Sequence, residues 1–72
     1  METIGTVEQW AESWLNVATM DYDEEDQVYT LRIRDKLIVH GEGQTQLEAR
    51  ADLLDILRCI AISGKLHRLP EP

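Results

Sequence analysis

The chain has 72 residues, of which 14 are acidic and 7 are Lys or Arg, so its formal net charge is −7. This length allows one small domain, and the charge repels nucleic-acid phosphates and anionic membranes. Cys59 is the single cysteine, which excludes a disulfide framework and, without Cys or His at ligand spacing, a zinc-stapled fold. We expect one domain over residues 1–72, with loose ends at 1–5 and 66–72.

The N-terminal residues have neither the basic segment nor the apolar segment of a signal peptide. No apolar run approaches the roughly 18 residues that a membrane span needs. We therefore expect a cytoplasmic protein that contacts no membrane.

The first predicted element is a helix over residues 7–16. Thr6 and Gln9 have the spacing of a capping box, and apolar residues recur behind them at helical spacing. These apolar positions are Val7, Trp10, Ala11, Trp14, Leu15 and Ala18. Residues 17–22 fit either the end of this helix or a short first strand.

An acidic turn and a hairpin are predicted next. Residues 21–26 are acidic except for Tyr22, and so many like charges indicate a solvated turn. Residues 27–34 alternate between apolar and polar side chains, which predicts a half-buried strand. A tight turn at Asp35 and Lys36 would lead into a strand over residues 37–40. We expect Gly41 and Gly43 to end that strand in a turn.

A long second helix is predicted to begin after Thr45, which forms a capping box with Glu48. It would end near Ser63, where Gly64 offers a left-handed C-terminal position. A stripe that can cover a sheet consists of Ala49, Leu53, Ile56, Leu57 and Ile60. The element order predicts an α+β fold, a two-layer α-β-β-β-α sandwich in which two helices back a three-stranded antiparallel sheet. Whether residues 17–22 form the first strand is left open.

The second helix is more apolar than one buried face requires, which leaves two interpretations open. The first helix covers the surplus surface through its two tryptophans, or another protein or a second copy of the chain covers it. In the second case we expect the partner to contact six apolar side chains: Trp10, Trp14, Leu47, Leu54, Ala61 and Ile62.

Residues 28–57 resemble the C-terminal half of a double-stranded-RNA-binding domain. The residues that carry the resemblance are Gly41-Glu42-Gly43, the helix cap Thr45, and Glu48-Ala49-Arg50 before an apolar helix. The resemblance implies the α-β-β-β-α order and lysines that contact RNA phosphates at the start of the last helix. Gln46 and Leu47 stand at those lysine positions here. The first helix and the loop after the first strand are also acidic, so we expect a domain of this fold that has lost duplex RNA binding.

A second family is also similar to part of the chain. Residues 16–58 resemble HicB-like antitoxin domains in having a strand, an acidic turn, a second strand and then a Thr-x-x-Glu-Ala helix, here Thr45 to Ala49. The closing residues 69–72 look like that family too. The helix that contains Trp10 would be an addition to the antitoxin pattern.

No catalytic, cofactor or metal site is predicted. Asp21, Asp23 and Glu25 alternate as in a calcium loop, but Asp26 and Arg32 stand where such a loop needs Gly and Glu. The Gly-x-Gly lacks the further residues of a phosphate-binding loop. Cys59 has apolar neighbours and is interpreted as an inert core thiol. We expect no enzyme and no cofactor.

Three functions are considered on this basis. The first is a non-enzymatic protein-protein interaction module that acts as an adaptor, regulator or dimerisation domain. The second is a small acidic inhibitor, such as an antitoxin or a phage anti-defence protein, that imitates nucleic-acid charge through Asp21, Asp23, Glu24, Glu25 and Asp26. The third is residual nucleic-acid contact through Arg32, Arg34, Lys36 and Arg50. We expect a protein partner, with a homodimer as one form, and no nucleic acid.

Overall fold

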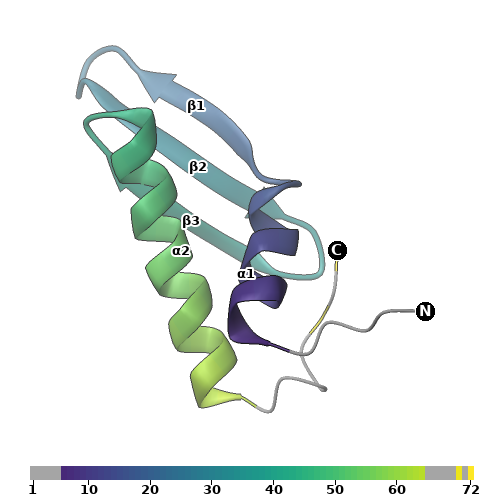
Figure 1. The fold of residues 1–72 in the computed structure, drawn as a ribbon. Coiled ribbons are helices and arrows are strands. Elements are labelled where there is room, and N and C mark those ends of the chain that lie inside the picture. The colour runs from purple at the N-terminus through teal and green to yellow at the C-terminus, as the bar shows by residue number, and fades with distance from the viewer. Residues whose placement is uncertain (1–5, 65–69, 71) are drawn as a thin grey trace.

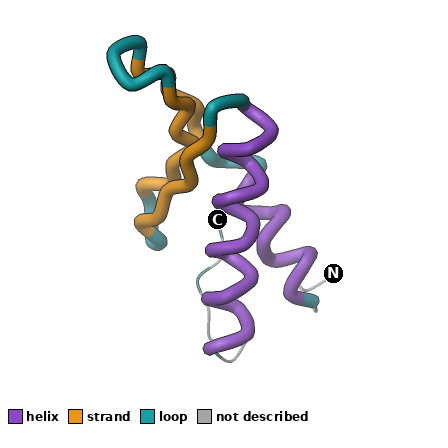
Figure 2. The backbone as a smooth tube through the Cα atoms, turned by 90° about the vertical axis from the view of Figure 1, so that its left-hand side faces the viewer, coloured by secondary structure: helices purple, strands orange, loops and turns teal. Residues whose placement is uncertain are grey.

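The computed structural model describes residues 6–64, 70 and 72. Its elements are α1 (Val7–Leu15), β1 (Thr19–Asp23), β2 (Val28–Arg34), β3 (Ile38–Gly43) and α2 (Gln46–Ser63) (Figure 1). The strands form one antiparallel sheet in the order β1-β2-β3, and both helices lie on the same side of it (Figure 2). The predicted α+β class and the three-stranded antiparallel sheet with two helices are confirmed. The ambiguous segment over residues 17–22 contributes to a strand, β1. This strand also includes Asp21, Tyr22 and Asp23, so the acidic turn begins after Asp23 and is shorter than the predicted 21–26.

Both helices begin where the capping boxes predicted. The Thr6 hydroxyl accepts a 3.0 Å hydrogen bond from the Gln9 amide, and the Thr45 hydroxyl accepts one of 3.1 Å from the Glu48 amide. The left-handed position predicted for Gly64 is wrong, since its backbone is extended with φ −102° and ψ 171°. Its amide donates to the Ile60 carbonyl, so the helix ends without a left-handed residue.

The core lies between the helices and the inner face of the sheet. The alternation predicted for β2 is confirmed at Leu31 and Ile33, which are buried on the helix side, and at Arg34, which is exposed. Thr30 departs from the pattern, since it belongs to the opposite face and is also buried. The helix α1 packs on α2, so it covers part of the surplus apolar surface of the long helix. The buried apolar residues are Trp10, Ala11, Trp14, Leu15, Leu31, Ile33, Ala49, Leu53, Leu57 and Ala61.

The strand β3 includes Gly41 and ends at Gly43, so the prediction that the strand stops at residue 40 and that these glycines form a turn is wrong. Neither has a positive φ, and their role is the close approach of α2 to the strand. A Cβ on Gly41 would lie 2.3 Å from the Leu53 amide nitrogen, and one on Gly43 would lie 2.4 Å from the Glu48 Cβ. Because backbone atoms of α2 occupy this space, the helix can pack this closely on β3 only where the strand has glycine.

Cys59 is exposed, which corrects its interpretation as a core thiol. It lies on the polar face of α2, four residues after Asp55 and seven after Asp52. The predicted loose ends fall outside the described residues, apart from Pro70 and Pro72.

Candidate interaction surface

Among the residues that the structure describes, no element covers the helix-facing side of β1. The helix α2 packs on β2 and β3, and α1 packs mainly on α2, so neither helix extends over the first strand (Figure 1). All five residues of β1 are exposed. Met20 and Tyr22 are directly opposite Leu31 and Tyr29, and opposite residues share a face of the sheet. Met20 and Tyr22 therefore point to the core side of the sheet, where they remain 37% and 49% exposed.

Tyr22 is held in place by a ring contact across the strands. The centroids of the Tyr22 and Tyr29 rings are 4.6 Å apart, with the planes tilted by 47°. Such a cross-strand aromatic pair fixes the ring orientation in the free domain. We call Met20, Tyr22 and Tyr29 the apolar ledge.

The register also shows which backbone groups of β1 are unpaired. The Glu42 amide donates a 2.9 Å hydrogen bond to Asp52 of α2, so it points away from β2. Backbone groups in an antiparallel ladder alternate in direction, and therefore Thr30, opposite Glu42, turns its own groups toward β1. By the same alternation, Met20 and Tyr22 turn their N–H and C=O groups to the outer edge of β1. Within residues 6–64 no strand pairs with that edge.

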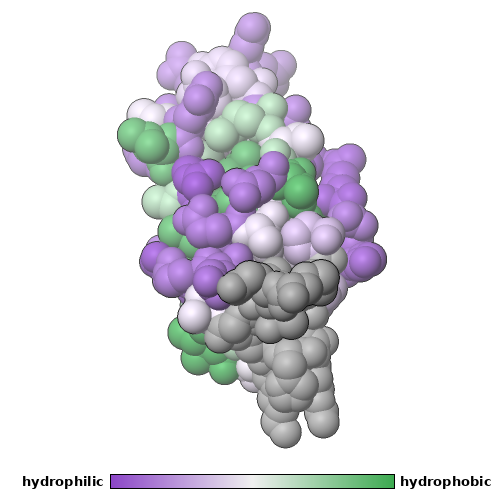
Figure 3. All heavy atoms as spheres, turned by 45° about the vertical axis from the view of Figure 1, so that its right-hand side comes forward, coloured by the Kyte–Doolittle hydropathy of each residue, from purple (hydrophilic) through white to green (hydrophobic). Residues whose placement is uncertain are grey.

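Acidic side chains flank the apolar ledge. Asp21 and Asp23 lie on the other face of β1, and the exposed turn after the strand adds Glu24, Glu25 and Asp26. The Asp23 carboxylate accepts hydrogen bonds from the Glu25 and Asp26 amides at 3.0 and 3.3 Å, which orders the start of the turn. Figure 3 shows hydrophilic side chains at this end of the molecule. The five predicted acidic residues are therefore brought together at one end of the sheet.

The six apolar residues predicted to contact a partner are not brought together. Trp10, Trp14 and Ala61 are core residues and present no surface, because α1 and α2 pack through them. Leu54 is half-buried against the same core. Leu47 and Ile62 are 78% and 74% exposed but stand at opposite ends of α2, about 22 Å apart along the axis. Figure 3 shows apolar residues as separate patches among hydrophilic ones. The apolar ledge, in contrast, was not predicted.

The four predicted nucleic-acid contacts lie on different faces. Arg50 belongs to the helical layer, where its guanidinium is 3.2 Å from the Glu12 carboxylate of α1. Arg32 and Arg34 point to the opposite, open face of the sheet, and Lys36 lies in the β2–β3 turn. The alternation of β2 puts Arg32 and Arg34 together on the face away from the helices, so they cannot form one surface with Arg50.

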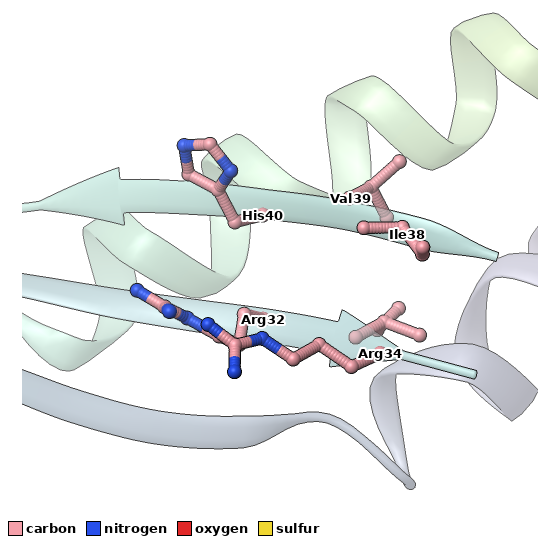
Figure 4. A pocket seen from close by; sticks show the side chains of 6 residues that line it. Arg32, Arg34, Ile38, Val39 and His40 are labelled. Atoms are coloured by element: carbon pink, nitrogen blue, oxygen red, sulfur yellow. The ribbon is translucent and has the colours of Figure 1, made fainter.

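A shallow cavity of about 230 Å³ lies on the open face of the sheet (Figure 4). It is lined by Arg32, Ile33, Arg34, Ile38, Val39 and His40. Acidic side chains lie beside two of these residues: the Arg32 Nε is 3.6 Å from Asp21, and the His40 Nε2 is 3.7 Å from Glu42. Of the two arginines that line the cavity, Arg32 thus lies close to a carboxylate of the domain.

No group of three His, Cys, Asp or Glu side chains in the described part of the chain could hold a metal ion. No helix among the described residues is both long and apolar enough to cross a membrane. The geometry defines a small α+β domain with an open strand edge beside an apolar ledge. Comparison with known proteins found no family model, no curated protein and no solved structure that matches the chain.

Proposed function

We propose that the domain is a non-enzymatic protein-protein interaction module that binds its partner at β1. One observation carries this proposal: the face of the sheet that is buried at Leu31 and Ile33 continues onto β1 as exposed Met20 and Tyr22. Apolar side chains beside an unpaired strand edge are costly to leave in water and favour association. A partner that covers them completes the layer that the two helices leave unfinished.

The distribution of cations supports a role other than duplex RNA binding. Among the described residues, Arg50 is the cation nearest to the start of α2, and its charge is paired with Glu12. The neighbouring β1–β2 turn carries acidic side chains, which repel phosphates. The resemblance to double-stranded-RNA-binding domains agrees with the order of the elements, and fold alone does not imply function.

The acidic end of the sheet favours a second candidate function. Its five carboxylates are exposed and adjacent, an arrangement that can occupy the basic channel of a nucleic-acid-binding enzyme. This inhibitor would bind through charge, so its affinity would fall steeply with salt. A partner on the apolar ledge would bind with weaker salt dependence.

Photo-crosslinking in an extract of the source cells tests the proposal. The photoreactive residue is benzoylphenylalanine, placed at Tyr22 in one variant and, as a matched exposed control, at Ile62 in another. We expect Tyr22 to give one dominant protein adduct that Ile62 does not give, and the purified adduct partner to bind the unlabelled chain. A variant labelled at Glu24 tests the second candidate, the acidic inhibitor. That function requires an adduct from Glu24 that is lost at about 0.5 M NaCl. Equal labelling from Tyr22 and Ile62 would overturn binding at β1.

A further inference from the structure

We infer that the free edge of β1 accepts an extended segment of another protein as a fourth, antiparallel strand, and that this segment alternates apolar residues with Lys or Arg. The inference rests on the proposed function and specifies the chemistry of the partner. It is drawn from three features of β1: its unpaired backbone groups, the apolar ledge on one face and the carboxylates on the other.

The backbone supplies the pairing. Met20 and Tyr22 direct their N–H and C=O groups outward, which offers four hydrogen-bonding groups to an added strand. The opposite edge of the sheet is less open, since Asp52 already accepts from the Glu42 amide there. Strand addition at an unpaired edge is a general mode of peptide recognition.

The apolar ledge sets every second residue of the incoming segment. Residues that pair with Met20 and Tyr22 must lie on the same face of the extended sheet. Apolar side chains at those positions would cover Met20 and the Tyr22 ring, which Tyr29 already holds in place. The same partner residues are the ones whose backbone groups bond to β1.

The carboxylates set the intervening residues. Asp21 and Asp23 lie on the other face, where intervening side chains of the added strand would lie beside them. The Asp21 side chain remains 65% exposed despite its 3.6 Å contact with Arg32. Glu24, Glu25 and Asp26 extend the negative field past the end of the strand. Lys or Arg at the intervening positions is the complementary choice.

A second copy of the chain fits this edge poorly. The register that pairs Met20 of one copy with Tyr22 of the other, and so uses all four outward backbone groups, is centred on Asp21. It would set the two Asp21 side chains directly opposite, and like charges at opposite positions are destabilising. Each copy also carries a net charge of −7. A basic segment meets neither obstacle.

The test uses the full chain, labelled with ¹⁵N, and a synthetic peptide of alternating Val and Arg. We expect the peptide to shift the resonances of β1 and to slow hydrogen exchange at the Met20 and Tyr22 amides about tenfold or more. Two further peptides carry N-methyl groups on the Val residues or on the Arg residues. Methylation at Val removes the pairing amides and should lower affinity about tenfold or more, while methylation at Arg leaves them intact. Equal affinity of the two methylated peptides would overturn strand addition.

Variants and peptide charge provide matched controls. Asp21→Asn with Asp23→Asn should weaken binding and reduce its salt dependence, while Asp35→Asn, an exposed acid in the other hairpin, should not. A Val and Glu peptide should not bind. If light scattering instead shows a dimer that Tyr22→Ala dissociates, a second copy occupies the edge and the inference is wrong. If the peptides do not bind while the Tyr22 variant still crosslinks one specific protein, the inference of strand addition is wrong and the proposed function is retained.

Discussion

The indole N–H of Trp10 donates a 2.8 Å hydrogen bond to the backbone carbonyl of Pro70, 60 residues later in the chain. Trp14 donates to the same oxygen at 3.0 Å. Both rings are fully buried, so both N–H groups require an acceptor inside the protein. A carbonyl oxygen has two lone pairs and can accept both. Pro70 is therefore a polar partner of the core.

Removing residues 70–72 should destabilise the domain, because two buried donors lose their acceptor. A buried unsatisfied donor costs about 1–3 kcal/mol, so we expect the free energy of unfolding to fall by roughly 2–5 kcal/mol. Urea unfolding followed by tryptophan fluorescence measures this change. Removing Pro72 alone is the control and should leave stability unchanged. Equal stability of both truncated chains would contradict the assignment of Pro70 as acceptor.

Gly41→Ala should be strongly destabilising. The added methyl group would lie 2.3 Å from the Leu53 nitrogen and 2.7 Å from the Ala49 carbonyl oxygen, which are backbone atoms that cannot rotate away. We expect thermal unfolding to show a loss of at least about 2 kcal/mol. Glu42→Ala changes the neighbouring residue on the open face of β3 and should alter stability by no more than about 0.5 kcal/mol. Similar losses in both variants would mean that α2 does not rest directly on Gly41.

Local sequence signals were sufficient to predict most of the elements. The hydroxyls of Thr6 and Thr45 cap the helices as their spacing to Gln9 and Glu48 predicted, because a capping box depends only on four consecutive residues. The alternation of β2 likewise indicates that Leu31 and Ile33 face the core. These features are decided within a few residues of chain.

The candidate site depended on features that no local pattern contains. Whether Met20 and Tyr22 are covered depends on where α2 crosses the sheet. The helix lies toward β3 because Gly41 and Gly43 allow it to pack closely there. In the sequence the same glycines resemble a turn. In the sequence Trp10 also fits an interface residue, and only the structure shows that it is buried with its N–H bonded to Pro70. Each of these features is set by contacts between elements distant in sequence.

Asp52 should protect the outer edge of β3. Its carboxylate accepts the 2.9 Å hydrogen bond from the Glu42 amide, so Asp52→Ala should speed hydrogen exchange at that amide by about tenfold. Global stability should fall by no more than about 1 kcal/mol, since alanine is a better helix former than aspartate. Asp52→Asn retains an acceptor oxygen and should keep much of the protection. Asp55→Ala, three residues later on the same helix, is the control. An unchanged exchange rate at Glu42 in Asp52→Ala would contradict the contact.

The ion pair between Glu8 and Arg58 should make stability depend on pH. Arg58 of α2 donates to the two carboxylate oxygens of Glu8 of α1 at 2.8 and 3.1 Å. The hydrogen bond from Arg58 holds the pKa of Glu8 below its ordinary value of 4.5. Because the unfolded chain then binds a proton more readily, the stabilisation is fully present above pH 4.5 and is lost as the pH falls through the folded pKa of Glu8.

We therefore expect Glu8→Gln to lower the free energy of unfolding at neutral pH and to have little effect at the acidic end of the same titration. Both side chains are partly solvated, so the difference should also shrink as salt screens the pair. Urea unfolding across this pH range, at low and high salt, measures the difference. Glu25→Gln, in the exposed β1–β2 turn, is the matched control and should show no such profile. A Glu8→Gln difference that persisted below the folded pKa of Glu8 would show that the carboxylate charge is not what joins the two helices.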